Sequence, residues 1–474
     1  MSNLTDLLPA GAGGKQVDFV ASGTIGNGVT VGLNSDGTVT AVAETSVPTS
    51  AGTPVVFESA QTTYTASSFD PVEQKVVVFY ADNDNSSYGT AVVGTISGSS
   101  ISFSTPVVFR SVGVNYVQAT YDSVSGKHVI LYNWIYGYAQ TATVSGNSIS
   151  FGADVMLINR QIRDTSVSAD VSSGKILFFY EEQTFNYFTY SVGTISGTSI
   201  SVGSATTISG SSLSGCVSVY DSSIGKVVIF YSLEPSNTLY AQVCIVSGTS
   251  LTFGTTVSPG YGQGSRLSAT YDSVNEKTIV FYRDTSIKAS VFTASGTTLS
   301  YGSAAVVTAD NAVPKATYNS TSGKIVVVYV NYSNSSYGTF KVGTVSGTSI
   351  SFGSAIVFES AETAEMSIAS SSSSGATIVS YQDGGNSYYG TSAVLTIANT
   401  TNNSADFIGI TDAAISDTAS GSVTIKGGIS TNVTGLTANL TYYVQDNGTL
   451  STTTSSVLAG KALSSTSINL DYTT

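Results

Sequence analysis

The sequence is poor in charged residues. Asp, Glu, Lys and Arg make up 10% of its 474 residues, and the formal net charge is −13. Soluble domains commonly contain roughly 25% charged residues. Because binding to nucleic acid requires clustered Lys and Arg, the acidic balance argues against a nucleic-acid partner. The same balance disfavours docking on an anionic membrane.

Cysteine and long apolar runs are also scarce. The two cysteines, Cys216 and Cys244, are too few for a disulfide scaffold. We expect them on two strands separated by a third, roughly 9–10 Å apart, which is beyond the reach of a disulfide, so both thiols should be free and buried. No stretch approaches the ~20 apolar residues of a membrane span. Residues 1–14 lack the features of a secretory signal, which predicts synthesis in a cytoplasm.

Catalytic motifs are absent as well. The single histidine, His128, lies in an apolar strand where the other copies of a repeat hold Val, Ile or Thr, so we expect a structural role. No nucleophile elbow, zinc-protease helix or phosphate-binding loop occurs. The segment 82–85 (Asp-Asn-Asp-Asn) lacks the glycine and closing glutamate of a calcium loop. We expect no catalytic residue, metal or cofactor, although an Asp/Glu pair for glycoside cleavage stays open.

What the sequence does contain is a repeat of about fifty residues, built on two strands and a short turn, as in 119–132. A lysine marks the turn at Lys75, Lys127, Lys175, Lys226, Lys277 and Lys324, with Ala376 in the same place once more. A tyrosine closes the second strand of each copy at Tyr80, Tyr132, Tyr180, Tyr231, Tyr282, Tyr329 and Tyr381. A period of this length made of short strands is typical of a propeller or a related array.

Each repeat reads as four strands. The first carries small side chains, which suit an inner strand beside a central channel. The second is nearly continuous in β-branched residues, which predicts burial on both faces. The third alternates and ends at a Ser-Gly turn before the fourth. An Asp five residues before the turn lysine, as in Asp122 and Lys127, should pair with it and order the hairpin.

The two ends of the repeat array complete each other. After residues 394–397 the last repeat lacks its fourth strand, whereas residues 52–59 precede the first repeat and match 353–360 almost residue for residue. Circular closure removes the exposed edges of an open array. We therefore predict an all-β chain with a seven-bladed β-propeller over residues 45–398, in which residues 52–59 complete the last blade.

The remaining ends, residues 1–44 and 399–474, should form one small β-sandwich or barrel, because closure brings them together. An Asp-Gly turn at 36–37 and an Asn-Gly turn at 447–448 are strong hairpin signals. Strands are predicted at 17–21, 29–33, 38–42, 406–410, 422–426, 441–444 and 467–471.

Aromatic residues mark one face of the propeller. The loops between the second and third strands differ in every copy and all emerge on that face. Aromatic rings beside amide and carboxylate groups can bind sugars or a protein partner, although some of these rings could instead pack between blades. The candidate ligand-binding residues are Tyr88, Trp134, Tyr136, Tyr187, Tyr240, Tyr337 and Tyr388.

Both ends and the repeats resemble virion structural proteins of tailed bacteriophages from aquatic bacteria. The resemblance rests on the segments 17–25, 33–39, 407–409, 435–437, 442–444, 448–450 and 462–464, and on repeats such as 337–353. It implies a virion-surface component, either a capsid decoration or head fibre or a tail fibre. It carries no catalytic residue across.

The preferred hypothesis is a non-enzymatic phage virion protein, made in the host cytoplasm and located on the virion surface. Its partners would be other capsid or tail proteins and a glycan or protein of the host surface, and we expect an oligomer with no membrane insertion. The alternatives are a bacterial extracellular surface or filament-forming protein and a carbohydrate-active enzyme.

Overall fold

The computed structural model describes residues 15–259 and 265–470, and residues 1–14, which lack the features of a secretory signal, lie outside these ranges. The chain divides into two compact units. Residues 48–398 form the propeller unit, and residues 1–47 and 399–474 form the terminal unit. The described residues contain strands and short 3₁₀ turns but no α-helix, so the predicted all-β class is confirmed. Within them, no helix is long and apolar enough to cross a membrane.

The second repeat shows how a propeller sheet is built. Its strands are β11 (Asn115–Asp122), β12 (Lys127–Asn133), β13 (Gly137–Ser145) and β14 (Ser148–Phe151), hydrogen-bonded antiparallel in that order. A further strand, β15 (Val155–Ile158), continues the outer edge by pairing with β13. Inner, second, third and outer strands therefore follow the predicted order.

The other repeats have the same plan. The first contains β6 (Val55–Asp70), β7 (Lys75–Asp82), β8 (Tyr88–Ser97), β9 (Ser100–Phe103) and β10 (Val107–Gly113). The third contains β16 (Ile162–Asp170), β17 (Lys175–Glu182), β18 (Tyr187–Ser196), β19 (Ser199–Val202) and β20 (Thr206–Ser209). The fourth contains β21 (Leu213–Asp221), β22 (Lys226–Leu233), β23 (Thr238–Ser247) and β24 (Ser250–Phe253).

The last three repeats complete the unit. The fifth contains β25 (Ser265–Asp272), β26 (Lys277–Arg283), β27 (Ile287–Ser295), β28 (Thr298–Tyr301) and β29 (Ala305–Thr308). The sixth contains β30 (Lys315–Asn319), β31 (Lys324–Asn331), β32 (Tyr337–Ser346) and β33 (Ser349–Phe352). The seventh contains β34 (Ile356–Ser370), β35 (Ala376–Asp383), β36 (Tyr389–Thr396) and β5 (Ser50–Ala51). Short 3₁₀ turns lie at η2 (Asn83–Asn85), η3 (Tyr332–Asn334) and η4 (Gly384–Asn386).

The inner strands pack against one another in a closed order. β6 contacts β11, followed in turn by β16, β21, β25, β30 and β34, and β34 contacts β6 again. This order supports the seven blades expected from the sequence, and the blade count stays a prediction.

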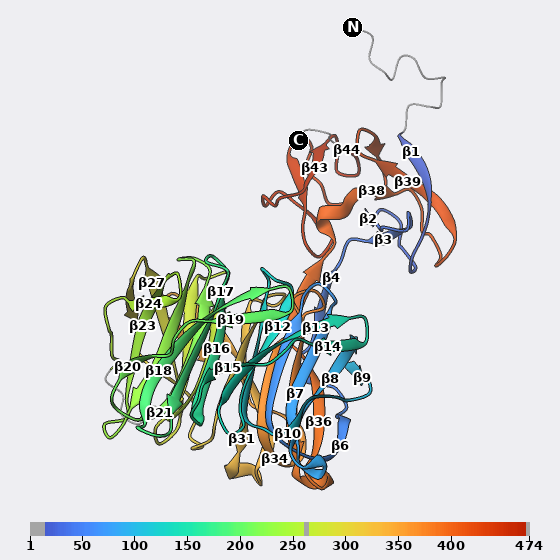
Figure 1. The fold of residues 1–474 in the computed structure, drawn as a ribbon. Helices are drawn as coiled ribbons and strands as arrows, with labels where there is room; N and C mark the ends of the chain where they lie inside the picture. The colour runs from blue at the N-terminus through green and yellow to red at the C-terminus, as the bar shows by residue number, and fades with distance from the viewer. Residues whose placement is uncertain (1–14, 260–264, 471–474) are drawn as a thin grey trace. The chain divides into compact units, whose positions relative to one another are not determined.

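Two long strands each belong to two neighbouring sheets. In β6 the first part pairs with β36, with Val56 opposite Thr391, and the second part pairs with β7, with Thr62 opposite Asp82. β34 joins β32 to β35 in the same way. Figure 1 shows β36, from near the C-terminus, beside β6 and β7 from near the N-terminus. The predicted closure by an N-terminal strand is therefore confirmed.

The turn between inner and second strands is ordered differently from the prediction. Asp122 does not pair with Lys127; its carboxylate accepts hydrogen bonds from the backbone N–H groups of Val124 and Ser125 at 3.1 and 3.2 Å. The Lys127 ammonium group instead donates to Thr143 on β13 at 2.9 Å. Equivalent lysine–threonine bonds join Lys75 to Thr95, Lys175 to Thr194 and Lys324 to Thr344. The expected Asp–Lys pairing is wrong. The Asp carboxylate instead accepts hydrogen bonds from backbone N–H groups of the turn, and the lysine bonds to the third strand.

The second strands form the core between sheets, as their continuous apolar runs predict. In β7, residues Val76, Val77, Val78, Phe79 and Tyr80 are each 0% exposed. His128 is also fully buried, with Nδ1 3.0 Å from Ser68 Oγ and Nε2 3.6 Å from Asp70. Cys216 and Cys244 are free and buried, as expected.

The terminal unit combines both ends of the chain, as predicted. One sheet has the order β1 (Gln16–Val20), β39 (Ser420–Ile425), β38 (Phe407–Thr411), β2 (Thr30–Leu33) and β3 (Val39–Ala41). A second has the order β40 (Ile429–Ser430), β44 (Ile468–Leu470), β43 (Leu458–Ala462), β41 (Thr441–Val444) and β42 (Leu450–Ser451). β4 (Glu44–Val47) pairs with β37 (Asn399–Asn402), which precedes η5 (Ser404–Asp406).

Candidate functional site

The inner strands surround a channel. One part of it is a cavity of 480 Å³ lined mainly by small side chains such as Ser67, Ser166, Ser218 and Ser268. Hydroxyl groups on neighbouring inner strands form hydrogen bonds in its wall, as Ser166 does with Ser218 at 2.9 Å. Because a narrow ring of strands leaves little room for bulk, the expectation of small residues beside a central channel is met.

A second cavity, of 380 Å³, lies at the start of the inner strands. In every repeat, the residue six positions before the turn Asp, or before Asn319 or Ser371 in its place, is among the residues that line it. We call these residues the channel ring: Tyr64, Tyr116, Asp164, Gly215, Arg266, Val313 and Glu365. Ligand pockets commonly range from about 300 to 1,000 Å³, so the cavity has the size of a binding site.

A local distortion of the inner strand turns the ring residues toward the cavity. The pairing register shifts at this point, for example between Thr63 and Ala66 in β6 and between Arg163 and Ser166 in β16. Five non-glycine ring residues have left-handed backbones, namely Tyr64, Tyr116, Asp164, Arg266 and Glu365, with φ between 44° and 62°. Such a conformation costs about 1–3 kcal/mol per residue and is concentrated at functional sites. Bulges of this kind re-aim side chains.

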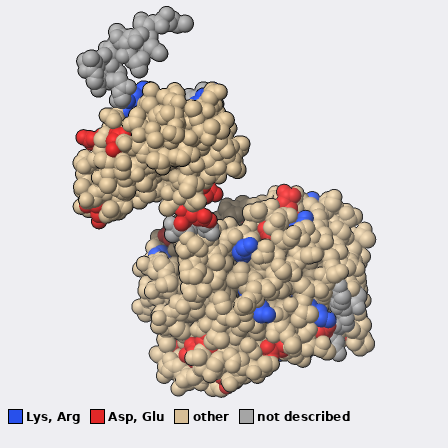
Figure 2. Space-filling model, turned by 180° about the vertical axis from the view of Figure 1, so that it is seen from behind, with Lys and Arg blue, Asp and Glu red and all other residues tan. Residues whose placement is uncertain are grey.

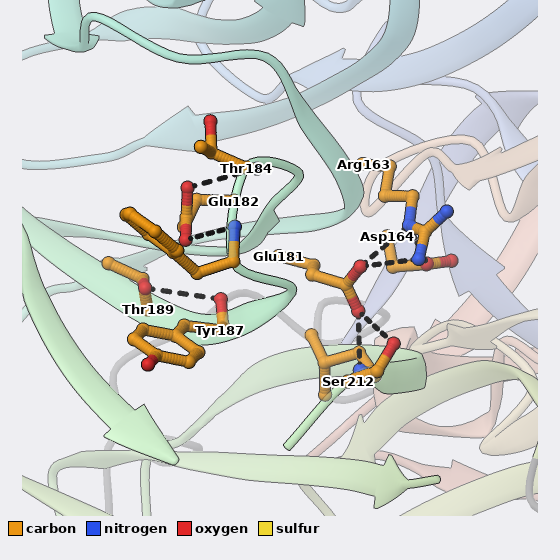
Figure 3. A network of polar contacts seen from close by, with 10 residues as sticks. Arg163, Asp164, Glu181, Glu182, Thr184, Tyr187, Thr189 and Ser212 are labelled. Carbon is orange, nitrogen blue, oxygen red and sulfur yellow. Dashed lines mark hydrogen bonds and ion pairs between the residues drawn. The ribbon is translucent and has the colours of Figure 1, made fainter. Parts of the chain in front are cut away.

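A buried carboxylate network lies behind the ring. Glu181, at the end of β17, is 0% exposed and accepts two bonds from Arg163, from Nε at 2.7 Å and from Nη2 at 2.6 Å. It also accepts from the Ser212 hydroxyl at 2.9 Å and from the Leu213 amide. Figure 3 shows Glu181 between Arg163 and Ser212, with Asp164 close to the guanidinium group. These donors satisfy a carboxylate that is fully removed from solvent.

This network affects the pKa of Asp164. Loss of water around its carboxyl group, together with repulsion from Glu181, raises the pKa of Asp164 to about 6. Arg163, whose Nε lies 3.8 Å from Asp164, and Arg266 oppose this shift by attraction. Near neutral pH the cavity therefore holds a carboxyl group that gains a proton more readily than an ordinary aspartate.

The rest of the ring joins aromatic and charged groups. The Tyr64 and Tyr116 rings lie 5.4 Å apart, tilted by 48°. The backbone N–H of Tyr64 donates to Glu365 Oε2 at 3.0 Å. Lys315, two residues after Val313, also lines the cavity, and burial together with the neighbouring charge of Arg266 lowers the pKa of its ammonium group, although Glu365 opposes the shift. The cavity thus offers aromatic faces, hydrogen-bond acceptors and cations.

The seven aromatic residues singled out from the sequence lie elsewhere, and none of them lines this cavity. Tyr88, Trp134, Tyr136, Tyr240 and Tyr337 are half-buried, whereas Tyr187 and Tyr388 are 38% and 39% exposed. Trp134 is covered by the Arg110 guanidinium group at 5.0 Å from its ring centre, and Tyr240 stacks on Tyr231 at 5.5 Å. Tyr187 lies beside Phe185 at 5.6 Å. The Tyr388 hydroxyl lies 3.5 Å from the carboxylate of a cavity-lining residue, Glu362, and Tyr337 pairs with the same residue in the sheet.

The channel ring was not predicted, although the sequence contains a pattern that marks it. At the ring position the seven copies hold Tyr, Tyr, Asp, Gly, Arg, Val and Glu, whereas the turn Asp and Lys recur almost unchanged. Chemical diversity at one position of an otherwise regular inner strand is what a ligand-facing ring requires. Ligand binding by the seven loop aromatics stays a prediction. Among the described residues, no cluster of three or more His, Cys, Asp or Glu side chains could hold a metal ion.

Comparison with known proteins finds likeness in fold alone. No protein-family model and no curated protein matches the sequence. A NanB sialidase structure from Streptococcus pneumoniae is 12% identical with a TM-score of 0.43, covering 72% of this chain and 70% of that one. Saccharomyces cerevisiae Sqt1 is 8% identical with a TM-score of 0.44, covering 74% and 99%. A mutant of AofleA from Arthrobotrys oligospora is 13% identical with a TM-score of 0.44, covering 68% and 94%.

Proposed function

We propose that the protein is a non-enzymatic structural component of a phage virion, located on the virion surface, whose propeller unit binds a glycan or protein on the host cell. The channel ring carries the binding part of this proposal. Equivalent positions in a repeat need no chemical variety to build a scaffold, yet here seven of them place aromatic, acidic, basic and small residues around one cavity. Aromatic faces combined with polar groups are the usual equipment of such sites.

The terminal unit supports the virion part of the proposal. Both ends of the chain belong to it, while the cavity belongs entirely to the propeller unit. Anchoring and binding can therefore be assigned to separate units, with the terminal unit attached to capsid or tail proteins. The surface is also low in charge: Figure 2 shows few acidic or basic side chains on the face in view. Such a surface suits repeated packing against other virion proteins.

Particle reconstruction tests the virion assignment. We expect cryo-EM of particles purified from the source culture to contain density for both units, on the capsid lattice or at the tail. Density on the capsid would identify a decoration protein or head fibre, and density at the tail a tail fibre. Absence of the chain from the particles, together with its presence on bacterial surfaces, would overturn the assignment in favour of a bacterial surface protein.

Attachment to host cells tests the ligand-binding part. Tyr64→Ala and Tyr116→Ala should each weaken attachment of the purified chain, because both rings line the cavity. Val72→Ala is the control, since this side chain lies on an exposed turn and should not affect attachment. Tyr337→Ala and Tyr388→Ala test the loop aromatics in the same assay. If only the loop variants lose attachment, with melting temperatures unchanged, the binding surface is the variable-loop face and the channel ring is not the site.

One observation favours a second candidate, a glycan-cleaving enzyme. Asp164, with its pKa raised to about 6, shares the cavity with the carboxylate of Glu365. Glycoside hydrolases use two carboxyl groups, one of which keeps its proton near neutral pH. Release of sugar from a glycan panel that is lost in both Asp164→Asn and Glu365→Gln would favour this candidate over binding alone.

A further inference from the structure

Two cations, Arg266 and Lys315, line the cavity outside every ion pair that the described residues form. Those ion pairs hold Arg110, Arg160, Arg163 and Lys288. The chain has only 17 Lys and Arg residues, and two of them line this one cavity together with the carboxyl groups of Asp164, Glu362 and Glu365. Both come from neighbouring inner strands, β25 and β30.

Burial disfavours the charge of one of these two cations, Lys315. Lys315 is half-buried, and loss of water lowers the pKa of its ammonium group; attraction to Glu365 opposes this shift, and the smaller repulsion from Arg266 adds to it. A charge removed from water without a partner is destabilising. An anionic group that entered the cavity would relieve the repulsion, and the guanidinium group of Arg266 has the fork geometry that matches a carboxylate.

The other residues that line the cavity limit the kind of molecule that can carry this anionic group. Asp164 and Glu365 line the same cavity and would repel a ligand that carried negative charge on every side. They would accept hydrogen bonds from hydroxyl groups. The Tyr64 and Tyr116 rings, on β6 and β11, add aromatic faces, against which the apolar face of a sugar ring packs. The ligand that satisfies all three features has one carboxylate, several hydroxyl groups and a ring.

We propose that this cavity binds a carboxylate-bearing sugar residue of a surface glycan. Arg266 and Lys315 hold its carboxylate, Tyr64 and Tyr116 pack on its ring, and Asp164 and Glu365 accept hydrogen bonds from its hydroxyl groups. The inference rests on the proposed glycan-binding function and names the class of sugar.

Calorimetric titration of the full chain tests the inference. The probes are methyl glycosides of glucuronic, galacturonic and N-acetylneuraminic acid, each paired with its neutral methyl ester. We expect at least one acid to bind at least about tenfold more tightly than its ester, because a hydrogen bond to a charged group contributes roughly 1.5–3 kcal/mol. High salt should reduce the difference.

Variants separate the cations from general effects on charge. Arg266→Gln and Lys315→Met should each lower affinity for the acid by about tenfold or more and bring it near that of the ester. Lys324→Met removes the same charge from a turn lysine bonded to Thr344 and should leave the affinity unchanged. Melting curves would verify that each variant is folded.

Three results would overturn the inference. The first is that no acid binds more tightly than its ester, and the second is that Arg266→Gln and Lys315→Met bind as the unaltered chain does. In either case, attachment to cells or binding to neutral glycans that still depends on Tyr64 would leave the proposed function intact. The third is the absence of any glycan or cell binding, which would remove the proposed function as well.

Discussion

The backbone N–H of Tyr64 donates a hydrogen bond to the Glu365 carboxylate at 3.0 Å, although the two residues are 301 positions apart in the chain. The bond links the first and last inner strands at the cavity, where Thr65 also donates to the Glu365 backbone carbonyl. The seam that closes the ring of strands and the wall of the cavity are therefore partly the same residues. A change at Glu365 should affect both closure and ligand binding.

Closure by the N-terminal strand predicts a specific stability effect at Phe57. This ring is 6% exposed and lies 5.2 Å from the Tyr80 ring and 5.6 Å from the Phe103 ring. Phe57→Ala should lower the free energy of unfolding by about 3–5 kcal/mol, as for a buried core phenylalanine. Chemical denaturation measures the change. Phe358→Ala, the equivalent in β34, is the matched variant, and a much smaller loss at Phe57 would mean that the N-terminal strand is only loosely attached.

The turn between inner and second strands predicts unequal roles for its Asp and Lys. Asp122 is 3% exposed and caps two backbone N–H groups, so Asp122→Ala should cost about 1–2 kcal/mol. Lys127→Met loses one bond to Thr143 and should cost about 1 kcal/mol or less. Thermal or urea unfolding compares them. Equal losses, or a larger loss for the lysine variant, would restore the Asp–Lys pairing.

The buried His128 predicts that the folded chain loses stability as the pH falls. Burial lowers the pKa of this histidine below its usual value of 6.5, although the nearby Asp70 opposes the shift. Below that value the unfolded chain binds a proton that the folded chain resists, so stability falls as pH falls. His128→Thr, the residue found at Thr278 and Thr377, should remove up to about 1.4 kcal/mol of this dependence per pH unit.

Urea unfolding at pH 7.5 and pH 5.0 measures that difference. Val227→Thr, the same position in another repeat, introduces no titrating group and should change stability equally at both pH values. An unchanged pH dependence in His128→Thr would show that His128 is charged, or freely titrating, in the folded chain.

Asp164 predicts the opposite dependence of stability on pH. Because its pKa is raised to about 6, the folded chain holds a proton that the unfolded chain releases above about pH 4. Stability from this group is therefore greatest at low pH and is lost as pH rises from about 4 to 6. Asp164→Asn should stabilise the chain above pH 7 by about 1 kcal/mol or less, since 36% of the side chain is exposed.

The neighbouring carboxylate provides the contrast. Glu181→Gln weakens the bonds that this buried side chain accepts from Arg163, Ser212 and Leu213. It should destabilise the chain at pH 7 by about 1–3 kcal/mol, since 38% of the Arg163 side chain is exposed and can be solvated. Thermal unfolding at pH 4.5 and pH 7.5 measures both variants. Stabilisation by Asp164→Asn at pH 4.5 but not at pH 7.5 would contradict the raised pKa.

Much of the fold could be predicted because its determinants are local or repeated. The strand predicted at 441–444 matches β41, and those predicted at 17–21 and 29–33 match β1 and β2 to within one residue. The match of 52–59 to 353–360 was sufficient to identify the strand exchange that β6 makes. Repetition converts a weak pattern into a strong one, since the same error would have to recur in each copy.

The site could not be predicted in the same way, for two physical reasons. The left-handed backbones of Tyr64 and Arg266 have no sequence signature, because neither residue favours that conformation. They coincide with a shift of the pairing register against the second strand. The loop aromatics, by contrast, were visible in the sequence, but whether a ring such as that of Tyr240 faces solvent or stacks on Tyr231 depends on tertiary packing.

The strand exchange also affects how such a gene can change. Thr49 and Ala398, at the two ends of the propeller unit, are joined by a hydrogen bond of 2.8 Å. The whole propeller therefore leaves and returns to the terminal unit through two adjacent points, as an inserted cassette would. Recombination that replaced residues 48–398 with another propeller of equally close ends would leave the terminal unit unchanged, so the two units could be exchanged independently in a single genetic event.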